Sequence, residues 1–341
     1  MEIFIHNSFQ LLEVFIFVAL GFLITFLVTP FFTDFLYRNH IGKKIRTTDY
    51  EGKKTPIFSR LHRGKENTPT MGGVLIWGVS GIITLIANFS RSGTLLPLFT
   101  LVSSGIIGAI DDLMNVFGIG FGRGGMRFRT KAVVYTFIAL IGAFWFAYKL
   151  GWLNRALFLP LIGNLVLGYW YIPLFVFVVV FGAFAANQTD GLDGLAGGIF
   201  AFAFGAYIFI SLLKGNLPLA IFCATITGAT LSFLWFNVYP ARFFMGDTGA
   251  MSLGMTLCVI AFLTNTVYVL PFVGFIMLLD AFSTIIQIIS KKFFHRKVFL
   301  VAPLHHHFEA LGWPETKVTM RFWIITAVMT SIGLALVLIN G

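Results

Sequence analysis

Ten stretches of mostly apolar residues divide this sequence, and they constrain its fold more than any other feature. An α-helix rises about 1.5 Å per residue, so about 20 apolar residues are needed to cross a hydrocarbon core of about 30 Å. Only 11% of the residues are charged, whereas soluble domains carry roughly a quarter. Such a chain cannot cover a globular surface with solvated side chains. The sequence therefore predicts an all-α integral membrane protein.

We expect residues 1–341 to form a single polytopic domain. The predicted spans are 11–33, 71–89, 95–111, 131–149, 171–187, 195–213, 217–236, 248–264, 268–290 and 320–339. The first is not expected to be a signal peptide, because Glu2 and Glu13 replace the usual basic region and no small-residue cleavage site follows. Between spans four and five, two apolar runs flank Gly163 and Asn164. This pattern predicts a small hairpin with a two-residue Gly-Asn turn.

Basic residues are concentrated in alternate connections. The odd-numbered connections, with two adjoining helix ends, hold 20 of the 24 Lys and Arg residues. The other four are Arg91, Lys149, Arg155 and Lys214. The positive-inside rule then places the odd connections in the cytoplasm and both termini and the hairpin outside. Because the membrane explains the net charge of +10, nucleic acid is not an expected partner.

Acidic residues collect at the same cytoplasmic face. Of the 14 acidic residues, 11 lie in or at the ends of the cytoplasmic connections. A transporter normally has polar groups near the bilayer midplane, where this chain offers only Asp280 and Gln287. A scaffold has no reason to gather carboxylates on one face. The distribution favours an enzyme that joins a cytoplasmic substrate to a lipid, with a transporter as the alternative from another class.

Two adjacent carboxylates, Asp111 and Asp112, close the third span. A helix C-terminus disfavours negative charge, so the pair requires a cation, either a metal or a basic side chain. Lys65 precedes the second span, and Lys131 begins the fourth. They fit two interpretations, interfacial anchors or groups that neutralise phosphates.

The connection between spans five and six consists almost entirely of Asn187 to Leu195, in which glycines alternate with polar side chains. Glycine allows a ligand to approach the backbone closely. A tight turn explains the glycines but not the carboxylates of Asp190 and Asp193. We therefore interpret this segment as a binding loop.

Asp247 stands just before the eighth span, where it fits an N-cap and a metal ligand at once. Aspartate oxygens suit Mg²⁺ or Mn²⁺ rather than zinc. The neighbouring Phe244 offers an aromatic face on which a base can stack. This segment predicts a second part of the same binding site.

Three consecutive histidines, His305 to His307, lie in the last cytoplasmic connection. Adjacent residues point in different directions, so at most two could reach one zinc ion. We favour imidazoles that form hydrogen bonds and contact anions, with metal ligation as the minor alternative.

Five short segments of the sequence together resemble the polyprenyl-phosphate N-acetylhexosamine-1-phosphate transferase superfamily, and the resemblance covers nearly the whole chain. They are Thr68 to Gly73, Asp111-Asp112, Asn187 to Gly194, Phe243 to Gly249 and Pro303 to Glu309, of which the last is most similar to the muramoyl-pentapeptide branch. The resemblance implies transfer of phospho-MurNAc-pentapeptide from UDP-MurNAc-pentapeptide to undecaprenyl phosphate in the bacterial inner membrane, which gives lipid I and UMP for peptidoglycan synthesis. A relative that uses UDP-GlcNAc would share the aspartates and differ around the histidines.

The resemblance also implies roles for particular residues, and the sequence departs from the pattern at none of them. The implied catalytic residues are Asp111, Asp112, Asp247, Lys131, His305 and His306, and the three aspartates are the candidate ligands for Mg²⁺ or Mn²⁺. The implied substrate-binding residues are Lys65, Asn187, Asp190, Leu192, Asp193, Asn237, Phe244, Gln287 and His307. We expect a homodimer. A one-step transfer and a two-step route through an aspartyl-phosphate both remain open.

Overall fold

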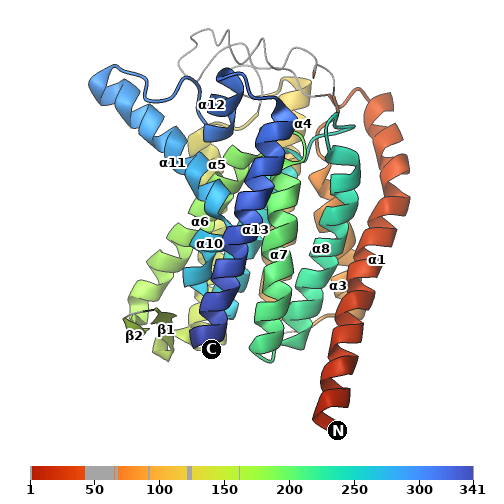
Figure 1. The fold of residues 1–341 in the computed structure, drawn as a ribbon, viewed down its shortest axis with the longest axis vertical. Coiled ribbons are helices and arrows are strands. Elements are labelled where there is room, and N and C mark those ends of the chain that lie inside the picture. The colour runs from red at the N-terminus through yellow and green to blue at the C-terminus, as the bar shows by residue number, and fades with distance from the viewer. Residues whose placement is uncertain are drawn as a thin grey trace.

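The computed structural model describes residues 2–42, 65, 68–90, 93–120, 125–160 and 162–340, with side chains from Ser8 onward. Within these residues the chain forms a bundle of long helices (Figure 1). Most of the first predicted cytoplasmic connection lies outside the described residues, as do Arg91 and Leu161 of the predicted outer face.

The long helices follow the predicted apolar segments, whereas α12 lies in the last predicted cytoplasmic connection. The helices are α1 (Glu2–Arg38), α3 (Gly73–Ala87), α4 (Leu95–Phe117), α5 (Phe128–Phe144), α6 (Tyr171–Thr189), α7 (Leu195–Leu213), α8 (Leu217–Asn237), α9 (Gly246–Leu263), α10 (Leu270–Val273), α11 (Phe275–Ile289), α12 (Leu304–Ala310) and α13 (Glu315–Asn340). The shorter elements are η2 (Trp145–Lys149), η3 (Trp152–Asn154), β1 (Ala156–Leu159), β2 (Gly163–Val166), η4 (Gly168–Trp170), η5 (Val267–Val269) and η6 (Ser290–Phe294).

The described chain contains fewer certain membrane spans than the ten predicted. Eight of its helices are long and apolar enough to cross a membrane. The predicted span 268–290 is not one straight helix, because the chain breaks at Gly274 and the segments before and after it meet at 81°. Counting this bent pair as one crossing gives nine. The predicted span 71–89 contains only α3, whose 15 residues are short for a full crossing.

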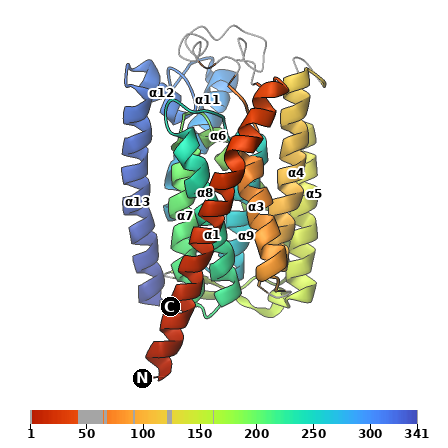
Figure 2. The same ribbon diagram turned by 90° about the vertical axis from the view of Figure 1, so that its right-hand side faces the viewer.

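The centre of the bundle is formed by α7, α8 and α9, which are mostly buried. By contrast, α1 and α13 expose most of their apolar residues on the outside of the bundle (Figure 2), as lipid-facing helices do. Small residues allow α9 to lie close to its neighbours. A Cβ at Gly73 of α3 would overlap the backbone of Gly249 in α9, so these two helices are in direct backbone contact.

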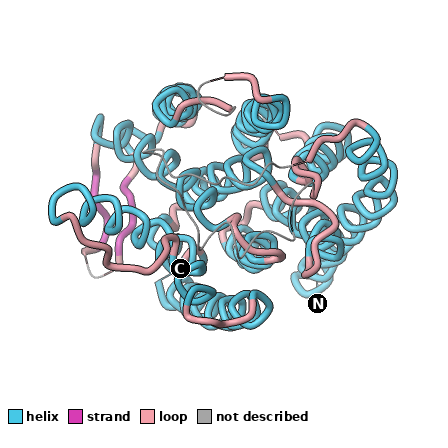
Figure 3. The backbone as a smooth tube through the Cα atoms, turned by 90° about the horizontal axis from the view of Figure 1, so that it is seen from above, coloured by secondary structure: helices cyan, strands magenta, loops and turns pink. Residues whose placement is uncertain are grey.

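The predicted hairpin is present, but its turn lies elsewhere. Strands β1 and β2 pair antiparallel, with Leu159 opposite Gly163, at one edge of the bundle (Figure 3). Gly163 and Asn164 therefore belong to β2, and the predicted Gly-Asn turn is wrong. Pro160 explains the difference, because it lacks the N–H group that would extend the ladder and ends β1 early.

The two ends of the bundle differ in content. Helices α4, α6 and α8 end, and α5, α7, α9 and α13 begin, near α12 (Figure 1). We call this the α12 end. Both chain termini lie at the opposite end with β1 and β2 (Figure 1), which we call the hairpin end. The topology thus gathers the predicted site residues at the α12 end.

Candidate active site

Gly108 brings the Asp111-Asp112 pair of α4 against the beginning of α9. A Cβ at Gly108 would lie 2.5 Å from Thr248 Cα, which is too close for any side chain. Both carboxylates are buried. The pair therefore faces the interior of the bundle and does not mark a solvated helix end.

Asp112 stabilises the N-terminus of α9. Its two oxygens accept hydrogen bonds from the backbone N–H groups of Asp247 at 3.2 Å and Thr248 at 3.1 Å. Asp190 accepts from the N–H of Gly246 at 3.0 Å. These carboxylates satisfy N–H groups that the first helical turn leaves unpaired and complement its positive dipole end. The predicted N-cap role of Asp247 is therefore wrong, because α9 begins at Gly246 and Asp247 lies inside its first turn.

Side chains from four helices form a cluster around Lys131. Its Nζ lies 2.5 Å from Asp111 Oδ2 and also donates to Asp247 Oδ2. Asn187 Nδ2 donates to Asp247 Oδ1 at 2.7 Å. The side chain of Asp111 is enclosed, whereas that of Asp247 is 21% exposed. We call Asp111, Lys131, Asn187 and Asp247 the Lys131 cluster.

Asp111 is extensively hydrogen-bonded. In addition to Lys131, it accepts from the backbone N–H of Met126 at 2.5 Å and from Asn115 Nδ2 at 3.2 Å. Lys131 is thus a cation beside Asp111, and the N-terminus of α9 complements the charge of Asp112.

A second lysine lies between carboxylates at the same end. Lys65 Nζ is 2.7 Å from Asp193 Oδ1 and 2.5 Å from Glu315 Oε1, and it lies 5.8 Å from the ring centroid of Phe244. Burial alone would lower the pKa of Lys65, but the charges of Glu315 and Asp193 outweigh burial and raise it. Lys65 therefore stays cationic. We call Lys65, Asp193, Phe244 and Glu315 the Lys65 cluster.

Asn237 joins the two predicted binding loops. Its Oδ1 accepts from the N–H of Gly194 at 3.0 Å, and its Nδ2 donates to the carbonyl oxygen of Phe243 at 2.8 Å. Asn237 is buried, and Leu192 is buried in the hydrophobic core. The geometry gives both residues a part in holding the loops in place.

His305 is held by Asp280 of α11. Its Nδ1 lies 2.9 Å from Asp280 Oδ2, and its backbone N–H donates to Asp280 Oδ1 at 3.2 Å. Both side chains are fully buried. His305 Nε2 has no hydrogen-bond partner in the described part of the chain. A Cβ at Gly191 would collide with this nitrogen, so the predicted binding loop has a glycine where the imidazole approaches it.

The other two histidines have different partners. His306 Nδ1 lies 2.6 Å from Glu309 Oε2, and His307 Nδ1 accepts from the N–H of Leu300 at 3.2 Å. Burial, with a smaller contribution from the charge of Glu315, raises the pKa of Glu309 to about 7. The three imidazoles are thus directed to three separate acceptors or donors.

Gln287 is engaged by the chain itself. Its Oε1 accepts from the N–H groups of Val298 and Phe299, both at 3.0 Å. Its Nε2 donates to the carbonyl oxygen of Phe299 at 2.8 Å. These bonds hold the segment that follows η6 and give Gln287 a structural role.

The donor atoms of the Lys131 cluster suit a hard cation. Among the described residues, no three His, Cys, Asp or Glu side chains are arranged to hold a metal ion. Mg²⁺ does not require three, since it usually keeps several waters and binds one or two carboxylates together with substrate phosphates. Of the three predicted ligands, Asp247 fits best because it is partly exposed. Asp112 fits least, because both its oxygens accept from α9.

The structure adds Asp280 and Glu315 to the residues expected from sequence. A lone carboxylate inside an apolar span is a signal that could have identified Asp280. Glu315 gives no such signal, because an acidic residue in the first turn of a helix is ordinary.

Comparisons with known proteins agree with this arrangement. The chain matches a model described as glycosyl transferase family 4 over residues 94–265, and one described as phospho-N-acetylmuramoyl-pentapeptide-transferase signature 1 over residues 65–76. These ranges include both lysines at the centres of the two clusters.

Three relatives, each named phospho-N-acetylmuramoyl-pentapeptide-transferase, illustrate the similarity. The protein from Chloroflexus aggregans is 38% identical over 335 residues, which cover 95% of this chain and 89% of the relative. The protein from Geobacillus sp. (strain WCH70) is 37% identical over 323 residues, with coverages of 93% and 95%. The protein from Rickettsia akari is 40% identical over 293 residues, with coverages of 80% and 81%.

Proposed function

The chain belongs to the phospho-N-acetylmuramoyl-pentapeptide-transferase family and forms lipid I in peptidoglycan synthesis, and from this premise we propose how its residues act. The reaction transfers phospho-MurNAc-pentapeptide from UDP-MurNAc-pentapeptide to undecaprenyl phosphate and releases UMP. One phosphate attacks a pyrophosphate, so catalysis depends mainly on charge neutralisation and alignment. The observation that carries the proposal is the position of Lys131 between Asp111 and Asp247 at the α12 end.

Asp247, with Asp111 beside it, is our proposed site for Mg²⁺ or Mn²⁺. When bound, the ion neutralises charge on the pyrophosphate and on the departing UMP. Asn187 orients the Asp247 carboxylate through its hydrogen bond to Oδ1. Lys131 balances both carboxylates and provides an ammonium group for a phosphate oxygen.

We favour direct attack by the lipid phosphate over an aspartyl-phosphate intermediate. Asp111 is enclosed, and its oxygens already accept hydrogen bonds from Met126, Asn115 and Lys131. Such bonds reduce the nucleophilicity of a carboxylate. A phosphate monoester, with a second pKa near 6, is largely dianionic at neutral pH and needs little help from a base. A rapid-quench search for protein that carries covalently bound phospho-MurNAc-pentapeptide tests this choice, and trapping that adduct on Asp111 would contradict it.

The Lys65 cluster is our proposed site for the uridine nucleotide. Phe244 offers a face for the uracil ring, Asp193 accepts hydrogen bonds, and Lys65 provides positive charge. The histidines after α11 are proposed to contact the sugar and its phosphate. In this arrangement Asp280 positions His305.

We also propose that the α12 end faces the cytoplasm of the bacterial inner membrane and that the chain crosses ten times, with α3 as a short crossing. Lys149, Arg155 and Lys214 are the few basic residues in the described chain that belong to the hairpin end, in accord with the positive-inside rule. A cysteine placed at Asn154 should react with an impermeant maleimide added outside spheroplasts. Labelling only after lysis would contradict the orientation.

The predicted homodimer is tested by measuring the mass of the protein in detergent.

The proposed activity is tested by UMP release from the purified protein. The assay contains undecaprenyl phosphate, Mg²⁺ and either UDP-MurNAc-pentapeptide or UDP-GlcNAc. We expect UMP only with the first nucleotide, and only when the lipid phosphate and the metal are present. Faster release with UDP-GlcNAc would instead support the alternative substrate.

A further inference from the structure

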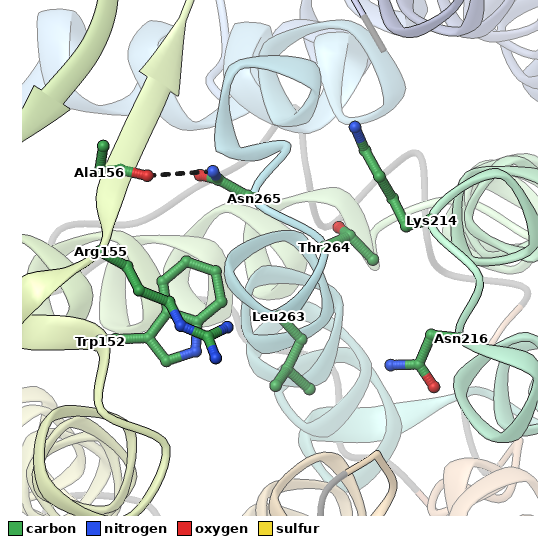
Figure 4. Close-up of a pocket in the computed structure, with 8 residues that line it drawn as sticks. All are labelled: Trp152, Arg155, Ala156, Lys214, Asn216, Leu263, Thr264 and Asn265. Carbon is green, nitrogen blue, oxygen red and sulfur yellow. Dashed lines mark hydrogen bonds between the residues drawn. The ribbon is translucent and has the colours of Figure 1, made fainter.

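A cavity of about 280 Å³ (Figure 4) lies at the hairpin end of the bundle, whereas the two clusters lie at the α12 end. It is formed where η3 and β1 meet the turn between α7 and α8 and the turn between α9 and η5. The residues that line it are Trp152, Arg155, Ala156, Lys214, Asn216, Leu263, Thr264 and Asn265. None of these eight is acidic.

Both charged residues of the cavity are cations. Arg155 and Lys214 approach it from different segments (Figure 4). No carboxylate lies within 4.0 Å of either cation among the residues that the structure describes. Two of the only four basic residues outside the predicted cytoplasmic connections therefore share one cavity. Both positive charges attract an anion that enters the cavity.

Neighbouring contacts hold the walls of this cavity in place. The Arg155 guanidinium carbon lies 5.1 Å from the ring centroid of Trp152. Asn265 joins β1 to the α9–η5 turn, since its Nδ2 donates to the carbonyl oxygen of Ala156 at 3.1 Å and its Oδ1 accepts from the N–H of Phe158 at 3.2 Å. These contacts fix Arg155 against Trp152 and β1 against the α9–η5 turn.

A neutral donor completes the lining. Asn216 Oδ1 accepts from the N–H of Leu219 at 3.2 Å and caps α8. Its amide nitrogen is turned toward Leu263 and the cavity (Figure 4). A guanidinium, an ammonium and an amide NH₂ group are all donors, so the complementary ligand is an acceptor with negative charge.

We propose that this cavity binds a phosphate-bearing anion, either the headgroup of an anionic phospholipid or a free phosphate. Arginine pairs with phosphate through parallel hydrogen bonds, and lysine adds a point charge. Trp152 and Leu263 supply an apolar wall beside these charges. The site does not depend on the proposed reaction, because it lies at the other end of the bundle.

The test uses the full-length protein in a nonionic detergent. Dihexanoyl-phosphatidylglycerol, inorganic phosphate and the zwitterionic dihexanoyl-phosphatidylcholine are each titrated, and the rise in Tm gives an apparent Kd. A double variant carries both Arg155→Gln and Lys214→Gln, and a single variant carries Lys149→Gln. Lys149 is the matched control, because it is an exposed cation of the same end that does not line the cavity.

We expect the wild type and Lys149→Gln to bind the glycerol lipid equally. The double variant should bind at least about tenfold more weakly, the effect of losing one charge-assisted hydrogen bond. If inorganic phosphate binds and the double variant weakens its binding, a free phosphate is a sufficient ligand. If the glycerol lipid binds and inorganic phosphate does not, the ligand is a lipid headgroup. Either result supports the proposal. Should the double variant unfold, Lys214→Gln alone must weaken binding in the same direction. Equal affinities of the wild type and the double variant, or an equal response to the choline lipid, would overturn the proposal.

Discussion

Lys131 and Lys65 each lie between two carboxylates at the same end of the bundle, yet their surroundings differ. The partners of Lys131 come from the long helices α4 and α9, and Asp247, which Asn187 of α6 also contacts, remains partly exposed. The partners of Lys65 come from the loop before α7 and from the first turn of α13. Lys65 also has an aromatic neighbour, since its Nζ lies 5.8 Å from the ring centroid of Phe244.

This difference indicates a division of labour. Groups that align reacting phosphates must be held rigidly, and helix ends hold side chains more precisely than loops do. Recognition of an organic base needs an aromatic face and hydrogen-bond acceptors, which loops commonly supply. We infer that the Lys131 cluster performs the transfer and that the Lys65 cluster recognises the nucleotide.

Asp247→Asn should have the largest effect and tests the chemical half of the comparison. Asparagine keeps the size of the side chain but removes the charge that a hard metal ion requires. We expect turnover to fall by about a thousandfold, comparable to the loss of a principal charge-stabilising group. UMP release at saturating substrate and Mg²⁺ measures the effect, and uridine-nucleotide affinity should change little.

Asp34→Asn is a matched control for this change. Asp34 is an exposed carboxylate of α1 that pairs with Arg38, and its substitution should leave turnover unchanged. Both variants should keep the wild-type Tm, because α9 is capped by Asp112 and Asp190. Near-normal Mg²⁺-dependent turnover of Asp247→Asn would remove Asp247 from the metal site.

Asp280→Asn tests whether the buried pair of Asp280 and His305, which lies against the binding loop at Gly191, contributes to catalysis. A carboxylate only accepts hydrogen bonds, so Asp280 favours a proton on His305 Nδ1. Asparagine can present an N–H group to the ring and reverse this arrangement. We expect turnover to fall roughly 10- to 100-fold, as for other groups that orient a functional histidine.

Two measurements separate this positioning role from a structural one. The pH profile of turnover should change in Asp280→Asn, and Asp280→Glu should recover part of the activity because it restores a carboxylate. A loss of Tm in Asp280→Asn with an unchanged pH profile would show that Asp280 only supports the fold.

Phe244→Ala tests the recognition half of the comparison. Stacking of a base on an aromatic ring contributes about 1–3 kcal/mol, so binding of UMP should weaken by roughly one to two decades. Phe244→Leu keeps apolar bulk without the ring and should restore little. The Mg²⁺ requirement should not change in either variant. An unchanged affinity for UMP excludes Phe244 from the nucleotide site and breaks the proposed division.

Local patterns in the sequence predicted much of this fold. Apolar length located the helices, and the expectation that the three adjacent histidines point in different directions agrees with the separate Nδ1 partners of His305, His306 and His307. The bend at Gly274 was not predictable in the same way, because the segment 268–290 stays apolar on both sides of the break.

Long-range contacts account for what the sequence did not predict. Lys65 and Glu315 are 250 residues apart, and no local pattern marks them as partners. Asp112 appeared equivalent to Asp111, but the packing of α4 against α9 directs the two carboxylates to different donors. Residue type and spacing identified the carboxylates of the site, whereas their separate roles depend on tertiary structure.

The smallest expected effect concerns pH and Glu309, which lies near the Lys65 cluster. Its pKa is raised from an ordinary 4.5 to about 7, first by burial and then by the charge of Glu315. Between these two values the folded protein keeps a proton that the unfolded chain has lost, so stability must fall as pH rises from about 4.5 to about 7 and then level off. Glu309→Gln retains a hydrogen-bonding group for His306 but cannot ionise. Relative to this variant, the wild type should lose a few degrees in Tm between pH 5 and about 7 and no more above it. Parallel Tm curves for the two proteins across this range would mean that Glu309 ionises as an exposed glutamate does, and the electrostatic link between the histidine segment and the Lys65 cluster would have to be abandoned.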